Sequence, residues 1–241
     1  MLDPTIIYED KDFLAVAKPA GLVVHAAKVS EKKRMANKRG EGDAAEPTLV
    51  DWLLARYPEI KTVGDDPAQR PGIVHRLDKA TSGIMLVART QAAFEYFKTL
   101  FQKHEIQKTY LAVVFGKPKN DHGVIDAPIG IKNGTLKRSV RSKKMAKPAV
   151  TEYKVMKTFE HDGEKYSLLE IKPKTGRTHQ IRVHLASIGH AVVGDPLYGR
   201  KRQPPDAKRL MLHAISLAFT APNGKAMQLI HRERGPLWYD Y

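Results

Sequence analysis

The chain has 241 residues, and its 41 Lys and Arg against 26 Asp and Glu give a formal net charge of +15. It has no cysteine, which excludes disulfides, thiolate-ligated metals and a thiol nucleophile, and no apolar run reaches the roughly 18 residues of a membrane span. The acidic start MLDPTIIYED lacks the features of a secretory signal. We therefore expect one domain over residues 1–241, cytoplasmic and not membrane-bound, with a polyanionic partner such as nucleic acid.

Short apolar runs rich in β-branched and aromatic residues predict strands, because they end at turns rich in Gly, Pro or Asp. Three other segments place apolar residues on one helical face, and Thr48 and Thr90 stand where they can cap the first two. Pro58 ends the first helix and Gly189 the third. In chain order we expect strands at 5–7 and 13–17, a helix at 49–57, a strand at 84–88, a helix at 91–104, strands at 110–115, 153–155 and 166–171, a helix at 178–188, and strands at 211–219 and 227–230. This order predicts an α+β fold with a mixed, largely antiparallel central sheet flanked by helices and loops.

The positive charge is concentrated in three segments. Residues 28–39 have six bases and one acid, residues 132–147 have seven bases and no acid, and residues 200–209 have five bases and one acid. One such run is usually a solvated surface, but three on an otherwise nearly neutral chain favour a surface that follows a phosphate backbone. The two longer segments are poor in apolar residues and lack a clear period, so we expect loops there. Residues 28–46 have the character of a basic insertion.

The segment GIVHRLDKATSG, residues 72–83, concentrates polar side chains between two glycines directly before an apolar strand. A loop that leads into a strand can hold a charged group rigidly, and Asp78 is the carboxylate available for chemistry. The alternative is a capped turn in which Asp78 only accepts backbone hydrogen bonds.

The segment TGRTHQIR, residues 175–182, leads into the third predicted helix. His179 and Arg182 are three residues apart and face the same side, where Arg182 could pair with a carboxylate or bind phosphate. The alternative is an exposed helical arginine. His179 and His184 are five residues apart, which does not match the spacing of a helical metal pair, and we expect no metal site. Phosphate-loop, dinucleotide-binding and serine-nucleophile motifs are absent from the sequence.

HRLDKATSG at residues 75–83 resembles the catalytic motif of the RluA-type pseudouridine synthases. The resemblance extends over most of the chain in the family's order, through KPAGLVVH at 18–25, KTY at 108–110, TGRTHQIRVHL at 175–185, GDPLYG at 194–199 and LHA at 212–214. Residues 28–46 depart from the common pattern. Because the chain begins close to the first motif, we expect no counterpart of the small RNA-binding module that precedes the catalytic domain in some relatives.

The resemblance implies a monomeric enzyme that isomerises uridine to pseudouridine in structured RNA, which is ribosomal RNA of the large subunit, transfer RNA or both, without cofactor or metal. It assigns the essential carboxylate to Asp78, as a nucleophile or as the base that leads to a glycal. Arg182 would pair with Asp78 and keep it ionised, Tyr110 would stack on the flipped base, and Arg76 would fill the gap left in the RNA. We expect further RNA contacts from Lys132, Lys137, Arg138, Arg141, Lys143, Lys144 and Arg177.

Other interpretations of single residues and of the whole chain stay open. Tyr110 alone would be read as a core aromatic on a strand, and His75 and His179 are expected to brace loops. The basic segments would equally suit a non-catalytic RNA-binding or ribosome-assembly protein on the same fold. A base glycosylase is a further alternative, which mass spectrometry would separate because isomerisation leaves the mass of the RNA unchanged.

Overall fold

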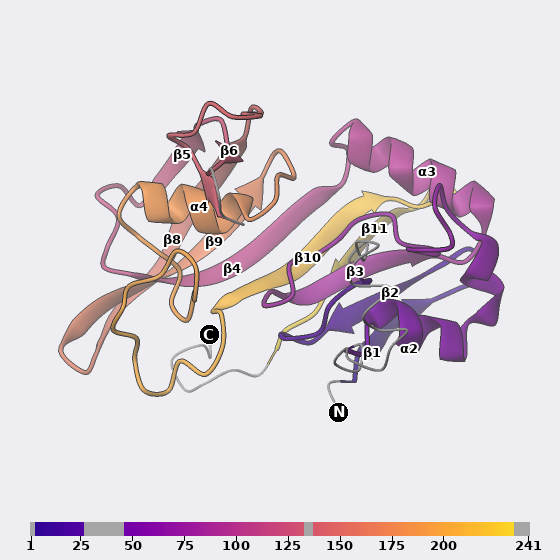
Figure 1. The fold of residues 1–241 in the computed structure, drawn as a ribbon, viewed down its shortest axis with the longest axis horizontal. Coiled ribbons are helices and arrows are strands. Elements are labelled where there is room, and N and C mark those ends of the chain that lie inside the picture. The colour runs from indigo at the N-terminus through magenta and orange to yellow at the C-terminus, as the bar shows by residue number, and fades with distance from the viewer. Residues whose placement is uncertain (1–2, 27–45, 133–136, 234–241) are drawn as a thin grey trace, which may run out of the picture.

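A computed structural model describes residues 3–26, 46–132 and 137–233. Nine strands form one sheet in the order β1-β2-β3-β10-β4-β9-β8-β5, with β11 paired to β10 (Figure 1). Of the pairs between these nine strands, β3 with β10 is parallel and the others are antiparallel. The predicted α+β fold with a mixed, largely antiparallel sheet is confirmed. The strands of this sheet are β1 (Thr5–Glu9), β2 (Phe13–Lys18), β3 (Ser82–Ala88), β4 (Gln107–Phe115), β5 (His122–Asp126), β8 (Val150–His161), β9 (Glu164–Pro173), β10 (Leu212–Thr220) and β11 (Ala226–Ile230).

Two helices cover opposite faces of the half of the sheet that contains β2 and β3. Phe13 and Leu86 pack with Phe97 of α3 (Gln91–Gln102), whereas Leu14 and Val87 belong to the cluster around α2 (Leu49–Arg56). Every residue of β2 and β3 is buried. Burial of both faces explains why these strands have continuous apolar runs rather than alternating ones.

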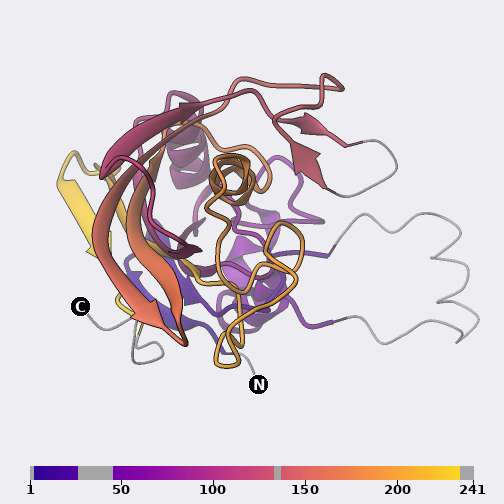
Figure 2. The same ribbon diagram turned by 90° about the vertical axis from the view of Figure 1, so that its left-hand side faces the viewer.

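The other half of the sheet curves around α4 (Gln180–Ser187), as Figure 2 shows. Ile181 and Leu185 of α4 pack into a cluster with residues of β4 and β9. This places the start of α4 beside the middle of the sheet.

Among the described residues, no helix has the length and apolarity to cross a membrane.

The helix ends follow the predicted capping. Thr48 and Asp51 form a reciprocal capping box at α2, and the Thr90 side chain accepts from Ala93 N at α3. Pro58 does more than end α2, since it opens a 3₁₀ helix, η1 (Pro58–Thr62). The third helix starts two residues later than predicted, because His179 adopts a left-handed backbone conformation with φ 58°.

All eight predicted strands are present, but three others are missing from the prediction. β5 is an edge strand with mostly polar or exposed residues, and β6 (Gly130–Ile131) and β7 (Arg138–Ser139) form a separate two-residue hairpin. β7 lies inside the basic segment 132–147, so the prediction of a loop for that whole segment is wrong. Residues 28–39 and most of the predicted insertion lie outside the described residues.

Candidate active site

A cavity of about 650 Å³ opens where the loop before β3, the starts of β4 and β10, and the segment before α4 meet. Sheet register brings these segments together. Ala214 on β10 pairs with Gly83 on one side and with Tyr110 on the other. Gly83 has φ +123°, and a β-carbon there would overlap the backbone of Ala214. Glycine at the end of the Asp78 loop is therefore required by the close approach of β3 and β10.

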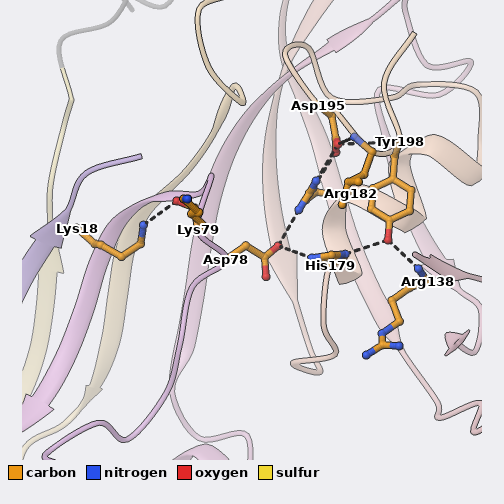
Figure 3. A network of polar contacts seen from close by, with 9 residues as sticks. Lys18, Asp78, Lys79, Arg138, His179, Arg182, Asp195 and Tyr198 are labelled. Atoms are coloured by element: carbon orange, nitrogen blue, oxygen red, sulfur yellow. Dashed lines mark hydrogen bonds and ion pairs between the residues drawn. The ribbon is translucent and has the colours of Figure 1, made fainter. Parts of the chain in front are cut away.

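Asp78 lies in this cavity with its side chain 20% exposed. Its Oδ2 accepts a hydrogen bond of 3.2 Å from Arg182 Nη1 and lies 3.8 Å from His179 Nε2 (Figure 3). The predicted pairing of Arg182 with Asp78 is thus present in the structure. Asp78 does not serve only as the cap of a turn, because its carboxylate faces two basic side chains from the other motif.

Arg182 is held mainly by Asp195, a residue for which the sequence suggested no role. Arg182 Nε and Nη2 each donate a 2.8 Å hydrogen bond to the Asp195 carboxylate, which is completely buried. Asp195 Oδ1 also accepts from the backbone N of Leu197 and of Tyr198. Burial opposes both charges, but the pair overcomes it, raising the pKa of Arg182 and lowering the pKa of Asp195.

The alternative of an exposed helical arginine is wrong, since the Arg182 side chain is only 3% exposed. Two of its nitrogens are committed to Asp195, and Nη1 is presented to Asp78. The bidentate geometry fixes the direction of the guanidinium plane. The predicted helix stripe did not reveal this, because Asp195 arrives from a turn beyond the helix.

A second chain of contacts reaches Asp78 through His179. Tyr198 Oη lies 2.9 Å from His179 Nδ1 and 2.8 Å from the backbone N of Arg138 on β7. Figure 3 shows Tyr198 between Arg138 and His179, with His179 next to Asp78. The GDPLYG motif thus supplies Asp195 and Tyr198, one for each basic group that faces the carboxylate.

Tyr110 lines the cavity from β4 and is half-buried. Burial, with the nearby charge of Asp78, raises its pKa well above the ordinary value, so the phenol keeps its proton at neutral pH. His75 also lines the cavity, where it stacks on Phe101 at 4.5 Å and accepts from Leu86 N at 2.9 Å. Burial holds the pKa of His75 at about 3, and this neutral ring braces the loop as expected.

Lys18, from the first motif, holds the Asp78 loop through a hydrogen bond to the backbone of the next residue, Lys79. Its buried ammonium donates to the carbonyl oxygens of Pro19 at 2.8 Å, Leu22 at 2.9 Å and Lys79 at 3.2 Å. Gly21 N donates to the same Lys79 oxygen at 2.8 Å. Burial lowers the pKa of Lys18 to about 8. The residue next to Asp78 is therefore anchored by two donors from the first motif.

The predicted RNA-contacting residues are not all near the cavity. Arg76 and Arg177 line it, whereas Arg138 contacts it only indirectly, because its backbone N donates to Tyr198 Oη and Tyr198 contacts His179 at the cavity. The other five bases lie along the segment around β7 and are not among the residues that line the cavity: Lys132, Arg141, Lys143 and Lys144, which are exposed, and Lys137, which is half-buried. Lys108, which the sequence did not single out, lines the cavity two residues before Tyr110 on β4.

Solved structures with this arrangement of strands and helices define the class. Human RNA pseudouridylate synthase domain containing 1 superposes with a TM-score of 0.72 at 26% identity, covering 96% of this chain and 84% of that one. Human RNA pseudouridylate synthase domain containing 4 superposes with a TM-score of 0.68 at 24% identity, covering 97% of this chain and 89% of that one. The fold is that of a pseudouridine synthase.

Sequence comparison narrows the class to a family. Residues 12–187 match the model of the RNA pseudouridylate synthases, and the chain belongs to that family. An uncharacterized RNA pseudouridine synthase of Aquifex aeolicus is 42% identical over 226 residues, and a ribosomal large subunit pseudouridine synthase D of Zymomonas mobilis is 39% identical over 231. Each alignment covers 90% of this chain but 65% of the relative, so the chain spans about two thirds of their length.

Proposed function

We propose that this chain isomerises uridine to pseudouridine within RNA, with Asp78 as the catalytic carboxylate. The observation that carries the proposal is the Asp78 carboxylate in an open cavity, 3.2 Å from a guanidinium that Asp195 holds in place. A preorganised charged pair at the base of a cavity is what a reaction with developing charge requires. Family membership supplies the reaction class.

The cavity has room for one flipped nucleoside, since its volume of about 650 Å³ lies in the usual range for small-molecule sites. Flipping is needed because the glycosidic carbon is inaccessible in a stacked helix. In the reaction the bond from N1 to C1′ breaks, the uracil turns, and a bond from C5 to C1′ forms. The proton on C5 is lost and N1 gains one, so the atoms balance.

Asp78 supports two routes for the first half of this reaction. It can attack the ribose or base as a nucleophile, or remove a sugar proton to give a glycal. Tyr110 lies across the cavity with a phenol that holds its proton, so it can stack on the base and act as a hydrogen-bond donor. Arg76 is exposed at the cavity, and we assign to it the space that the flipped base leaves in the RNA.

The basic side chains around the cavity supply the contacts to phosphate. We assign this role to Arg177 and Lys108, which line the cavity, and to the bases of residues 132–147 around β7. Relatives named as ribosomal large subunit pseudouridine synthases favour ribosomal RNA over transfer RNA as the substrate. A monomer in the cytoplasm completes the proposal.

The test uses Asp78→Asn, which keeps the shape of the side chain and removes its charge. We expect the variant to bind RNA as the unchanged protein does and to form no pseudouridine, measured by chemical mapping in ribosomal and transfer RNA from cells that lack the gene. Arg76→Met serves as the comparison, since it should weaken RNA binding and slow turnover without abolishing it. Unchanged turnover in Asp78→Asn would refute the assignment, and binding without turnover in the unchanged protein would favour a non-catalytic RNA-binding role.

A further inference from the structure

Tyr198 joins the β6–β7 hairpin to the imidazole beside Asp78. Its Oη contacts the backbone N of Arg138 and His179 Nδ1, and His179 Nε2 lies 3.8 Å from Asp78 Oδ2 (Figure 3). We propose, building on the function proposed above, that Tyr198 and His179 are positioning residues for Asp78. The Tyr198 hydroxyl fixes His179 in the tautomer that carries its proton on Nε2, facing the carboxylate.

The direction of each hydrogen bond follows from its donor. A backbone N–H can only donate, so Tyr198 Oη is the acceptor in its 2.8 Å bond with Arg138. The hydroxyl has one hydrogen of its own, and its second partner among the described residues is His179 Nδ1 at 2.9 Å. Donation to Nδ1 gives both the hydroxyl hydrogen and Nδ1 a hydrogen-bond partner. The neutral ring must then carry its proton on Nε2.

The opposite tautomer would cost free energy at both ends of the imidazole. With the proton on Nδ1, Tyr198 Oη would receive two donors and its own hydrogen would have no acceptor among the described residues. The lone pair on Nε2 would then face the Asp78 carboxylate at 3.8 Å, where two negative ends repel each other. Both effects favour the proton on Nε2.

The backbone shows that His179 is held in place at a cost. It has φ 58° and ψ 19° at the entrance to α4, a left-handed conformation that is unfavourable for a non-glycine residue. The Tyr198 ring lies edge-on to the imidazole, with centroids 5.6 Å apart. Burial lowers the pKa of His179, so the neutral ring required by this hydrogen-bond pattern is the form present near neutral pH.

One turn supports both basic groups that face Asp78. Asp195 Oδ1 accepts from the backbone N of Tyr198 at 3.0 Å and binds Arg182 Nη2 through the same oxygen. The Tyr198 ring also lies beneath the guanidinium, with Arg182 Cζ 5.3 Å from the ring centroid. Arg182 and His179 therefore approach Oδ2 from supports that belong to one turn, and the Arg138 amide ties that turn to β7.

The first test reads the tautomer directly by nitrogen NMR of the free protein. We expect a single His179 tautomer with the proton on Nε2, and a mixture of tautomers in Tyr198→Phe, which keeps the ring and removes Oη. Tyr96→Phe is the matched control, because it also removes a hydroxyl with two hydrogen-bond partners, Thr220 O and Ala221 O. A proton on Nδ1 in the unchanged protein, or no change in Tyr198→Phe, would overturn the proposal. This result does not depend on which RNA is the substrate.

The second test separates the position of the donor from the strain of the backbone. In His179→Gln, the side-chain amide nitrogen can occupy the position of Nε2. In His179→Asn, the side chain is one bond too short for this, but asparagine tolerates the left-handed backbone conformation better. We expect Asn to give the more stable protein in thermal unfolding and Gln to keep the higher kcat, by about tenfold, with similar KM for RNA. Equal kcat values, or a higher kcat for Asn, would show that His179 acts only as a structural brace.

Discussion

Arg182 donates two hydrogen bonds of 2.8 Å to Asp195 and one of 3.2 Å to Asp78, so the buried Asp195 carboxylate fixes the guanidinium with Nη1 directed at Asp78 in the cavity. Three of the charges at the site thus form one unit. Asp195 is the member that solvent does not reach, and its removal should affect both folding and catalysis.

We expect Asp195→Asn to lower the free energy of unfolding by about 3 kcal/mol, because it leaves a buried guanidinium without its bidentate partner. Turnover should fall as well, since Arg182 would lose its fixed direction toward Asp78. Urea unfolding and single-turnover kinetics measure the two effects. Asp51→Asn is a useful comparison, because Asp51 is an exposed carboxylate of the α2 capping box that does not line the cavity, and its substitution should cost only about 1 kcal/mol. Equal losses in the two variants would contradict the central role of Asp195.

Asp78, Arg182 and Tyr110 could be named from the sequence because they lie in ordered motifs, and the structure brings all three to one cavity. Asp195 and Tyr198 lie in such a motif too, but their partners come from α4 and β7. Asp195 and Arg182 are 13 residues apart and Tyr198 and Arg138 are 60 apart. These contacts depend on how the turn packs against α4 and β7, which no local sequence period predicts. The order of the motifs therefore predicted which segments meet at the site. It could not predict which side-chain atoms make the contacts, because these depend on tertiary packing.

The strands also differ in how far the sequence alone predicts them. β2, β3 and β4 have apolar runs long enough to be recognised, because both faces of the sheet or one whole face is covered there. β5 has one buried residue, Ile125, and Val124 on it is 64% exposed. Its strand conformation comes from pairing with β8, a tertiary contact that outweighs weak local propensity.

Gly83→Ala should destabilise the protein far more than an ordinary glycine substitution. A β-carbon would meet the Ala214 backbone, in addition to the strain of φ +123°. Gly163→Ala is the matched control, with φ +73° and nothing within 4 Å of the added atom, so it should cost only about 1–2 kcal/mol. Thermal unfolding of both variants measures the difference. If Gly83→Ala costs no more than Gly163→Ala, the close approach of β3 and β10 does not limit this position.

Lys18 predicts a pH dependence of stability between pH 8 and 10.5. Burial lowers its pKa from 10.5 to about 8 in the folded protein, so the unfolded chain binds more protons in that interval. The free energy of unfolding contributed by Lys18 must then rise as the pH increases from 8 to 10.5, and stay constant well below pH 8. We expect the difference in unfolding free energy between the unchanged protein and Lys18→Met to follow this course in urea titrations. A difference independent of pH would show that the ammonium is not desolvated.

Lys108 should contribute one phosphate contact at the cavity. It lies on the same face of β4 as Tyr110, since the two are two residues apart on a strand, and its ammonium has no hydrogen-bond or ion-pair partner within residues 3–26, 46–132 and 137–233. Burial lowers the pKa of Lys108, and an approaching phosphate would stabilise its charge. Lys108→Met should therefore weaken RNA binding and reduce the slope of log K against log salt by about 0.7–0.9. Lys225→Met, at an exposed turn beyond the other end of β10, should leave the slope unchanged, and an identical slope for both variants would exclude a phosphate contact at Lys108.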